Sequence, residues 1–481
     1  MRKLESGLLI AAALALGGCS LAPAYKAPAV PVAEHYADTG PWVQAAPAAP
    51  LPREGWWRLY RDPQLDRLQQ QLLANNPDLA AALAHYRQAE AFSAQARAGL
   101  FPQLGVGAAA QRNRQSDTRP LRGAGSPSYY DNYTLGAQLD YEVDLWGRVR
   151  NGAAAGRDDA QAAAADLAAV QLSLQAMLAD NYLQLRGLDQ QVQLLDQSME
   201  AYRRALQLTQ SRHEGGIVSG LDVTRAQAQL ASAKSLWSQT QAQRALIEHA
   251  IAALVGASAS DFHLAAETAA IELPAVPLGV PSTLLQRRPD IAAAERRTAA
   301  ANARVGVARA AWFPSLTLGA AGGYQSTGWG GLVAAPNRFW AIGPTLLLDV
   351  FDGGYRKATV AAAKAATDAA GASYRGVVLG AFQQVEDNLA LLDHLGTARG
   401  DQKDAADASQ HALDLALDRY KQGAASYLDV VEAQTMALDA QRSLLDLTTR
   451  QLRASVQLIR ALGGGWEAGD GRMAAAGGRA G

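Results

Sequence analysis

The sequence predicts a mainly α-helical protein with a membrane β-barrel portion, built from a duplicated helix–strand–strand–helix unit. Three observations support this class: an internal repeat marked by prolines, alternating apolar residues after those prolines, and a stretch of 66 residues that contains no proline. Alanine-rich segments extend the helical prediction, because alanine is the best helix former. Hydrophobic residues make up 49% of the 481 residues, so a packed core is possible.

The internal repeat keeps a constant spacing over long stretches. An alignment of 30 residues at an offset of 212 places Pro102 over Pro314, and a later offset of 207 places residues 212–227 over residues 419–434. Each proline follows a helix-like segment and ends it, because proline lacks an amide donor and pushes the preceding residue toward an extended conformation. Each copy therefore reads helix, strand, loop, strand, long helix, turn and helix.

Apolar residues that alternate with polar ones predict the strands. The predicted strands cover about residues 103–113, 132–146, 315–326 and 339–352. A half-buried strand of a soluble protein shows the same alternation, whereas an apolar outer face with a polar interior describes a membrane barrel. Even the smallest membrane barrels need about eight strands, so four strands have to be shared between subunits.

Three carboxylates lie in one row of the second predicted strand. Asp140, Glu142 and Asp144 share a face because successive side chains of a strand point to opposite sides. Such a row suits a cation-attracting wall of a barrel lumen. A solvated strand face explains it equally well.

The long stretch from Gly147 to about Arg212 predicts one helix of roughly 100 Å. Its apolar residues follow a spacing of three and four with one polar interruption, from Leu174 to Leu206, and the last predicted helix repeats this spacing with Arg442 in one of the seam positions. A sustained period of 3.5 residues favours a coiled coil over ordinary helix packing.

The N-terminal residues have the pattern of a secretory signal. A basic start and a short apolar stretch occupy residues 1–18, directly before Cys19, which is the only cysteine. The letters "LGGC" resemble a bacterial lipobox, in which the cysteine becomes the lipidated N-terminus, and Ser20 after it implies sorting to the outer membrane. A chance cysteine after an ordinary signal is the alternative. No later segment has 18 consecutive apolar residues, so we expect no transmembrane helix.

Composition divides the rest of the chain. We expect an extended Pro- and Ala-rich strap at 19–60, a first repeat at 61–256, a linker at 257–286, a second repeat at 287–463 and a disordered Gly-rich tail at 464–481.

Several function classes are disfavoured. The net charge is −1 without a basic block, which argues against nucleic acid as a partner. The seven histidines are scattered and have no metal-ligand spacing, so we expect no metal and no catalytic residues. The covalent lipid on Cys19 is the only added group that the sequence predicts.

Several motifs together resemble the TolC family of outer-membrane efflux channels, and within it the lipoprotein branch that serves resistance-nodulation-division multidrug pumps. They are the lipobox, the duplicated "FP", "DLWGR" at 144–148, "FDGG" at 351–354 and the turns "GGIVSGLDV" and "QGAASYLDV". The resemblance covers about residues 20–463. It implies a homotrimer in which twelve strands form an outer-membrane barrel and long helices form a periplasmic coiled-coil tunnel. It also implies a periplasmic adaptor and an inner-membrane pump as partners of this passive duct.

The resemblance further implies a gate at the periplasmic helix ends, which close as an iris. The letters "YKQGAASYLDVVEAQ" match that region, so Leu428 corresponds to the apolar plug and Asp429 and Glu432 to acidic positions, although the family often has Asp at the last of these. Three copies of such a carboxylate ring would favour cations and raise the carboxylate pKa values by mutual repulsion.

Asp222 and Tyr420 match a pair that latches neighbouring helices in the family. Ala425 stands where an assisting arginine often occurs, which predicts a weaker or differently built latch. Asp222 and Asp429 also suit ordinary capping of a helix start after a turn, so capping is the alternative for both residues.

The expected function is an outer-membrane exit duct for drugs or other small toxic molecules. A protein-secretion duct, a metal-ion export duct on the same fold and a non-conducting lipid-anchored coiled-coil tether are the alternatives. The lipoprotein signal favours drug efflux over protein secretion, and the lack of Met- or His-rich clusters argues against copper or silver export.

Overall fold

The computed structural model describes residues 20–31, 36, 55–118, 123, 125–276 and 287–466. The predicted signal at 1–18, Cys19 and most of the predicted tail lie outside these residues.

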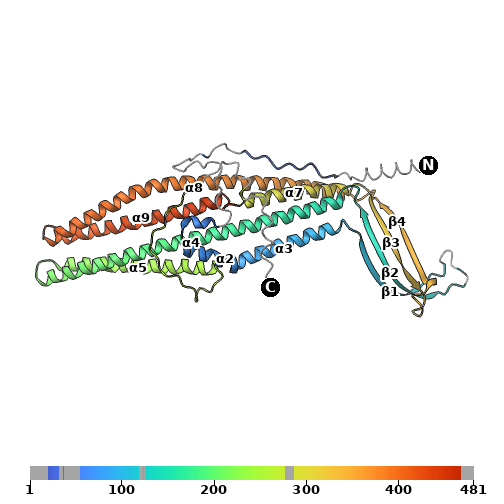
Figure 1. Ribbon diagram of the computed structural model, residues 1–481, viewed down its shortest axis with the longest axis horizontal. Coiled ribbons are helices and arrows are strands. Elements are labelled where there is room, and N and C mark those ends of the chain that lie inside the picture. The colour runs from blue at the N-terminus through green and yellow to red at the C-terminus, as the bar shows by residue number, and fades with distance from the viewer. Residues whose placement is uncertain are drawn as a thin grey trace. The chain divides into compact units, whose positions relative to one another are not determined.

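The described elements follow the predicted order (Figure 1). In chain order they are η1 Trp56–Tyr60, α2 Pro63–Asn75, α3 Pro77–Ala98, β1 Gln103–Arg114, β2 Tyr129–Val143, α4 Arg148–Glu214, α5 Gly220–Leu254, α7 Pro289–Ala310, β3 Ser315–Ser326, η3 Ala335–Asn337, β4 Arg338–Leu347, α8 Tyr355–Lys421 and α9 Tyr427–Ala461.

The duplication is present element by element. Four of the five pairs have equal lengths: α3 and α7 have 22 residues, β1 and β3 have 12, α4 and α8 have 67, and α5 and α9 have 35. The fifth pair differs, because β2 has 15 residues and β4 has 10. The starts of the pairs differ by 212 positions before the hairpins and by 207 after them. Both offsets equal those of the sequence repeat.

Two strands end earlier than the alternation predicts. The second strand ends at Val143 rather than at 146, and the fourth ends at Leu347 rather than at 352. Glycines with positive φ follow in both places, Gly147 at 77° and Gly354 at 96°, and such backbone favours a turn. The alternating letters continue past each strand because they also occur in the turn that leads into the next helix.

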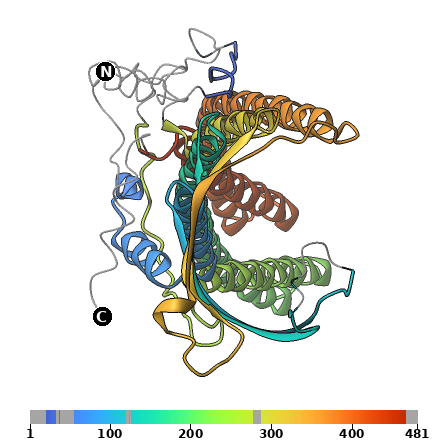
Figure 2. The ribbon, with the colours of Figure 1, turned by 90° about the vertical axis from the view of Figure 1, so that its right-hand side faces the viewer.

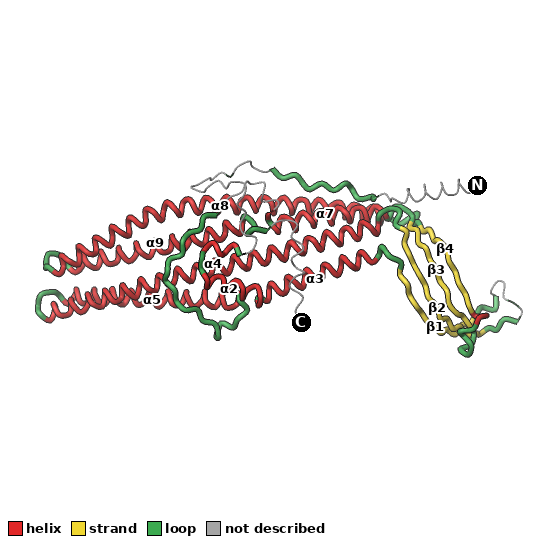
Figure 3. Tube along the Cα trace, viewed as in Figure 1, coloured by secondary structure: helices red, strands yellow, loops and turns green. Residues whose placement is uncertain are grey.

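The chain forms two compact units, and the first contains residues 20–29, 86–163 and 293–374 among those described. Its four strands pair antiparallel in the order β1-β2-β3-β4, so β1 and β4 are the sheet edges (Figure 3). Figure 2 shows that this sheet is curved.

The strand register collects the apolar side chains on one face. Leu104 lies opposite Leu139, which lies opposite Ala320, which lies opposite Ile342. The other face carries mostly small or polar residues. Val106 is 78% exposed and Ile342 is 74% exposed, so no described part of the chain covers the apolar face at these positions. A soluble half-buried sheet would bury this face, and that alternative is therefore disfavoured.

The N-terminal residues of the first unit run along α7 in the opposite direction. Five hydrogen bonds join them to helices, in this order: Ser20 to Asn151, Leu21 to Arg309, Pro23 to Asn302, and Tyr25 to both the carboxylate and the carbonyl of Glu295. The contact is close, since a Cβ on Gly306 would lie only 2.7 Å from the Ala22 Cβ. Residues 20–25 are thus seated as an extended strap on this helix.

The second unit contains the hydrophobic core. Its described residues come from 30–85, 164–292 and 375–466, and the core joins η1, α2, α4, α5, α8 and α9. Leu178, Val385 and Ile459 are fully buried there. The seam predicted for α4 faces this packing, because Leu185, Leu195 and other seam residues are buried. One stretch of α4 is long and apolar enough to cross a membrane by length and composition alone, a test that a core helix also meets.

Two buried ionic groups fix the linker of the second unit. Arg186 on α4 pairs with Asp62 at 2.7 Å and with Glu267 of the linker at 3.0 Å. Arg244 on α5 pairs with Asp189 at 2.6 Å and donates to the Leu264 carbonyl at 2.7 Å. Linker residues 262–276 contain no helix or strand. The two arginines hold them together with Glu248 and Asp189, which accept from the Leu264 and Glu267 backbone N–H groups.

Candidate functional site

The two helical hairpins of the second unit end in matching turns, seen at the left of Figure 1. The turn between α4 and α5 contains Gly216 at a φ of 72°, and the turn between α8 and α9 contains Gly423 at a φ of 77°. Ile217 N donates to the Arg212 carbonyl at 2.8 Å, and Ala424 N donates to the Arg419 carbonyl at 2.8 Å. Glycine in this left-handed position closes a helix end in the Schellman arrangement.

The predicted gate and latch acids both cap the helix that follows the turn. Asp429 Oδ2 accepts from the Ser426 backbone N–H at 2.8 Å, and Asp222 Oδ2 accepts from the Ser219 backbone N–H at 3.3 Å. Each pair forms a capping box. The capping alternative therefore describes the geometry of both residues within one chain.

The hydrogen bonds from Ser426 also set the charge state of Asp429. They hold the pKa of this carboxyl below its ordinary value, because they stabilise the ionised form. Within one chain this direction is opposite to the rise expected from a ring of carboxylates. Asp429 is thus an ionised cap at the turn.

The other predicted gate residues point away from the packed core. Leu428 is 40% exposed and Glu432, one helical turn later, is also exposed. Residues four apart share a face of a helix. Among the described residues, the Glu432 carboxylate has no hydrogen bond or ion pair. One exposed face of α9 therefore presents an apolar and an acidic side chain together.

The predicted latch residues are not bonded to each other in this structure. Tyr420 is 4% exposed, packs edge-to-face against Tyr427 with ring centroids 5.4 Å apart, and has its hydroxyl 3.4 Å from Thr209 Oγ1. Asp222 pairs with Arg225 on its own helix at 3.5 Å. The structure thus brings Tyr420 into a different set of contacts from those predicted.

Arg212 is the residue at these turns that sequence reasoning did not assign. It crosses from the end of α4 to the end of α8, where it donates to the carbonyls of Tyr420 and Lys421. The repeat alignment shows that Arg212 and Arg419 occupy equivalent positions before the paired turns, but it does not indicate a contact between the hairpins.

The row of acids predicted on the second strand is largely neutralised. Glu142 accepts from Arg148 Nε at 2.7 Å, and Asp144, which lies beyond the end of β2, pairs with Arg150 at 3.1 Å. Asp140 instead accepts from the Gln138 amide at 2.9 Å. The arginines of the first turn of α4 thus balance two of the three charges within one chain.

The duplicated "FP" lies at the border between helices and strands of the first unit. The Trp146 indole stacks on the Phe313 ring with centroids 4.6 Å apart, and its N–H donates to the Pro314 carbonyl at 2.8 Å. The "DLWGR" motif of the first copy therefore binds the "FP" motif of the second copy.

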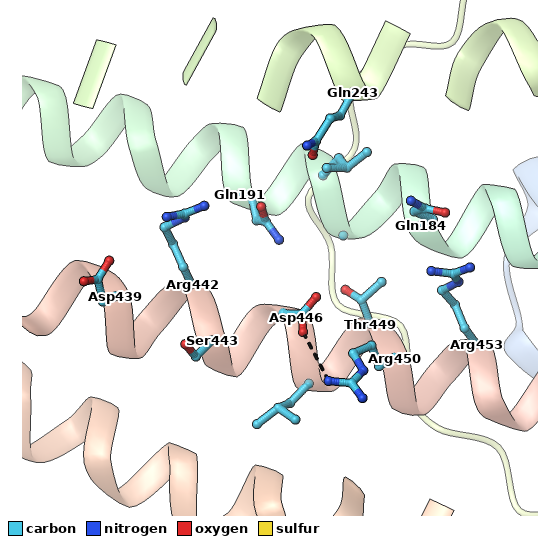
Figure 4. A pocket seen from close by; sticks show the side chains of 13 residues that line it. Gln184, Gln191, Gln243, Asp439, Arg442, Ser443, Asp446, Thr449, Arg450 and Arg453 are labelled. Carbon is cyan, nitrogen blue, oxygen red and sulfur yellow. Dashed lines mark ion pairs between the residues drawn. The ribbon is translucent and has the colours of Figure 1, made fainter. Parts of the chain in front are cut away.

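A polar cavity of about 650 Å³ lies between α4, α5 and α9 in the second unit. Figure 4 shows Arg442 of α9 directed toward Gln191 of α4, with Gln243 of α5 on the far side. Arg442 Nε is shielded from solvent and has no hydrogen-bond partner among the described residues. The predicted seam is thus interrupted by an arginine whose Nε is unpaired within the described part of the chain.

The described residues include no group of three or more His, Cys, Asp or Glu side chains placed to hold a metal ion.

Comparison with known proteins identifies the family to which the chain belongs. The family model described as outer membrane efflux protein matches residues 68–257 and 280–464. The chain belongs to this family, which comprises transport channels rather than enzymes. It is an outer-membrane channel of an efflux system.

Individual relatives agree with this assignment over nearly their whole length. The antibiotic efflux pump outer membrane protein ArpC of Pseudomonas putida is 34% identical over 464 residues, which are 95% of each chain. The outer membrane protein OprJ of Pseudomonas aeruginosa is 33% identical and covers 98% of each chain. The MtrE outer membrane channel of Neisseria gonorrhoeae, solved in an open state, has a TM-score of 0.81 and 27% identity, and the match covers 93% of this chain and 99% of that one.

Proposed function

We propose that the chain is the passive exit duct of a tripartite pump that exports drugs or other small toxic molecules. It acts as a homotrimer whose twelve strands close a barrel in the outer membrane. A periplasmic adaptor and an inner-membrane pump of the resistance-nodulation-division type are its partners. The name of ArpC as an antibiotic efflux protein supports the drug class of substrate.

The apolar face of the sheet is the observation that carries this proposal. Side chains such as Val106 and Trp340, which is 79% exposed, would be unstable in water as one continuous surface but match the hydrocarbon of a bilayer. The edge strands β1 and β4 each have a single neighbour among the described strands. Backbone groups in lipid have to be paired, so each edge needs a strand of another copy. Three copies supply twelve strands, which is above the minimum of about eight.

The strap supports a lipid anchor on Cys19. Ser20, the next residue, bonds Asn151 in the first turn of α4, and Leu21 accepts from Arg309 near the end of α7. Both helix ends adjoin strands of the sheet. A lipid on Cys19 would thus begin one residue from the border between helices and strands, which is where a bilayer surface lies in the proposed assembly.

We propose that the gate of this duct lies at the hairpin turns. The exposed face of α9 with Leu428 and Glu432 would meet its copies around the axis and narrow the passage. Because Asp429 is a helix cap, its replacement would change both the helix start and the charge. Glu432 has no such second role among the described residues, so it is the better test of the gate.

The experiment is single-channel recording of the purified full-length protein in a planar bilayer. Step-like unitary currents support a duct, whereas a coiled-coil tether would give none. E432Q removes the charge without changing the volume and is expected to raise the conductance of the closed channel. The charge-removing control D407N lies on α8 and affects only a surface pair with Lys403, so it should leave the currents unchanged. Equal currents in E432Q and the wild type would contradict the gate position.

A further inference from the structure

Arg212 joins the tips of the two helical hairpins within one chain. Its Nη1 donates to the Tyr420 carbonyl at 2.8 Å and its Nη2 donates to the Lys421 carbonyl at 2.7 Å. The guanidinium carbon also lies 4.7 Å from the centroid of the Tyr420 ring. One side chain of α4 thus holds the last turn of α8 by two hydrogen bonds and a cation–π contact.

The chemistry of the contact explains why an arginine occupies this position. Lys421 is the last residue of α8, and the final carbonyls of a helix lack donors within the helix and carry partial negative charge. A guanidinium presents parallel N–H groups that reach two neighbouring oxygens at once, and it also stacks on an aromatic ring. The ring also packs edge-to-face against Tyr427, which is 2% exposed.

The second copy of the repeat shows that this contact is not a general property of the turn. Arg419 is the equivalent of Arg212, yet among the described residues it donates only to the Ala424 carbonyl of its own turn, at 3.4 Å. The turn therefore forms without an arginine that reaches the other hairpin. The crossing contact of Arg212 is an addition to the turn geometry.

We propose that Arg212 is a clasp that holds the α4–α5 and α8–α9 tips together in the closed channel and is released when the channel opens. This inference rests on the proposed gate at the same turns. It assigns the closing contact to a guanidinium, two backbone carbonyls and a ring face. It differs from the latch expected from sequence, which uses the Tyr420 hydroxyl and Asp222.

The test is planar-bilayer recording of the full-length trimer with R212A and the matched control R203A. Arg203 lies on the exposed side of the same helix and pairs only with Glu200 on that helix. Loss of two charged hydrogen bonds should raise the open population about tenfold in R212A. R203A should behave like the wild type. R212K keeps the positive charge but lacks the two parallel N–H donors of the guanidinium, so it should give an intermediate increase of the open population. It also tests the proposal if R212A does not fold.

Y420F separates the clasp from the hydroxyl latch. The substitution removes the hydroxyl but leaves the ring and the backbone carbonyl that Arg212 contacts, so it should not increase the open population. An increase in Y420F without one in R212A would overturn the clasp and favour the hydroxyl latch. Wild-type currents with an unchanged R212A would also overturn the clasp, whereas absent wild-type currents would overturn the duct itself.

Discussion

Trp146 and Phe313 lie on different copies of the repeat, and their rings stack with centroids 4.6 Å apart at the border between the helices and the sheet. The same indole donates its N–H to the Pro314 carbonyl at 2.8 Å. The proline that ends α7 thus also offers the acceptor that attaches the end of β2. This contact joins the two halves of the duplication where the chain changes from helix to strand.

Removal of the Trp146 contacts should weaken this border. W146F keeps an aromatic ring but loses the N–H donor, and we expect a loss of about 1 kcal/mol because the Pro314 carbonyl then lacks that partner. W146A also loses the stacked surface and should cost about 3–5 kcal/mol. Thermal unfolding of the detergent-solubilised protein measures both. Equal losses in the two variants would show that the ring itself contributes nothing.

The strap depends on the absence of a side chain at Gly306. G306V should displace residues 20–25, because a Cβ there would lie 2.5 Å from Asn151 Nδ2 and 2.7 Å from the Ala22 Cβ. We expect faster proteolytic cleavage within the strap and little change in the sheet. G376A is the matched control, since a Cβ at Gly376 of α8 meets nothing within 4 Å and alanine favours a helix. Unchanged cleavage in G306V would contradict the seated strap.

The cap of α9 should respond to pH through Asp429. Its pKa in the folded chain is lowered by the hydrogen bonds from Ser426, whereas an unfolded Asp has a pKa of about 3.9. The cap therefore stabilises the helix start above about pH 4, and this stabilisation is lost as the pH falls through the lowered pKa. Amide-exchange protection of the first turn of α9, corrected for intrinsic rates, should fall below about pH 4. D429N removes the titrating carboxyl and should abolish this pH dependence, and its persistence in D429N would assign it to another group.

The repeat made much of the fold predictable. Prolines and glycines mark where elements end, and the two copies of the repeat give two estimates of each boundary. The predicted start of the long helix at Gly147 is therefore only one residue from Arg148, where α4 begins. The strand ends were less predictable, because alternation continues into turns whose positive φ values depend on Gly147 and Gly354.

The site was less predictable than the fold. Sequence reasoning placed the acids directly after the hairpin turns, where the structure also has them, but could not separate a capping acid from a gating acid, because either would follow such a turn. It missed Arg212 because its partners are backbone carbonyls of Tyr420 and Lys421, which leave no trace in residue types. It also could not foresee that Arg148 and Arg150 turn back onto acids before them.

Arg442 should limit the stability of the packing between α4, α5 and α9. Its Nε is shielded from solvent without a hydrogen-bond partner among the described residues, and such a group costs about 1–3 kcal/mol. R442M keeps the length of the side chain and removes the charge, so we expect a higher midpoint of thermal unfolding. Arg450 provides the control, because it is exposed and 3.7 Å from Asp446, and R450M should change the free energy of unfolding by less than about 0.5 kcal/mol. A lower midpoint in R442M would show that the guanidinium has a partner in the assembled protein, and the cavity around it would then be an occupied site.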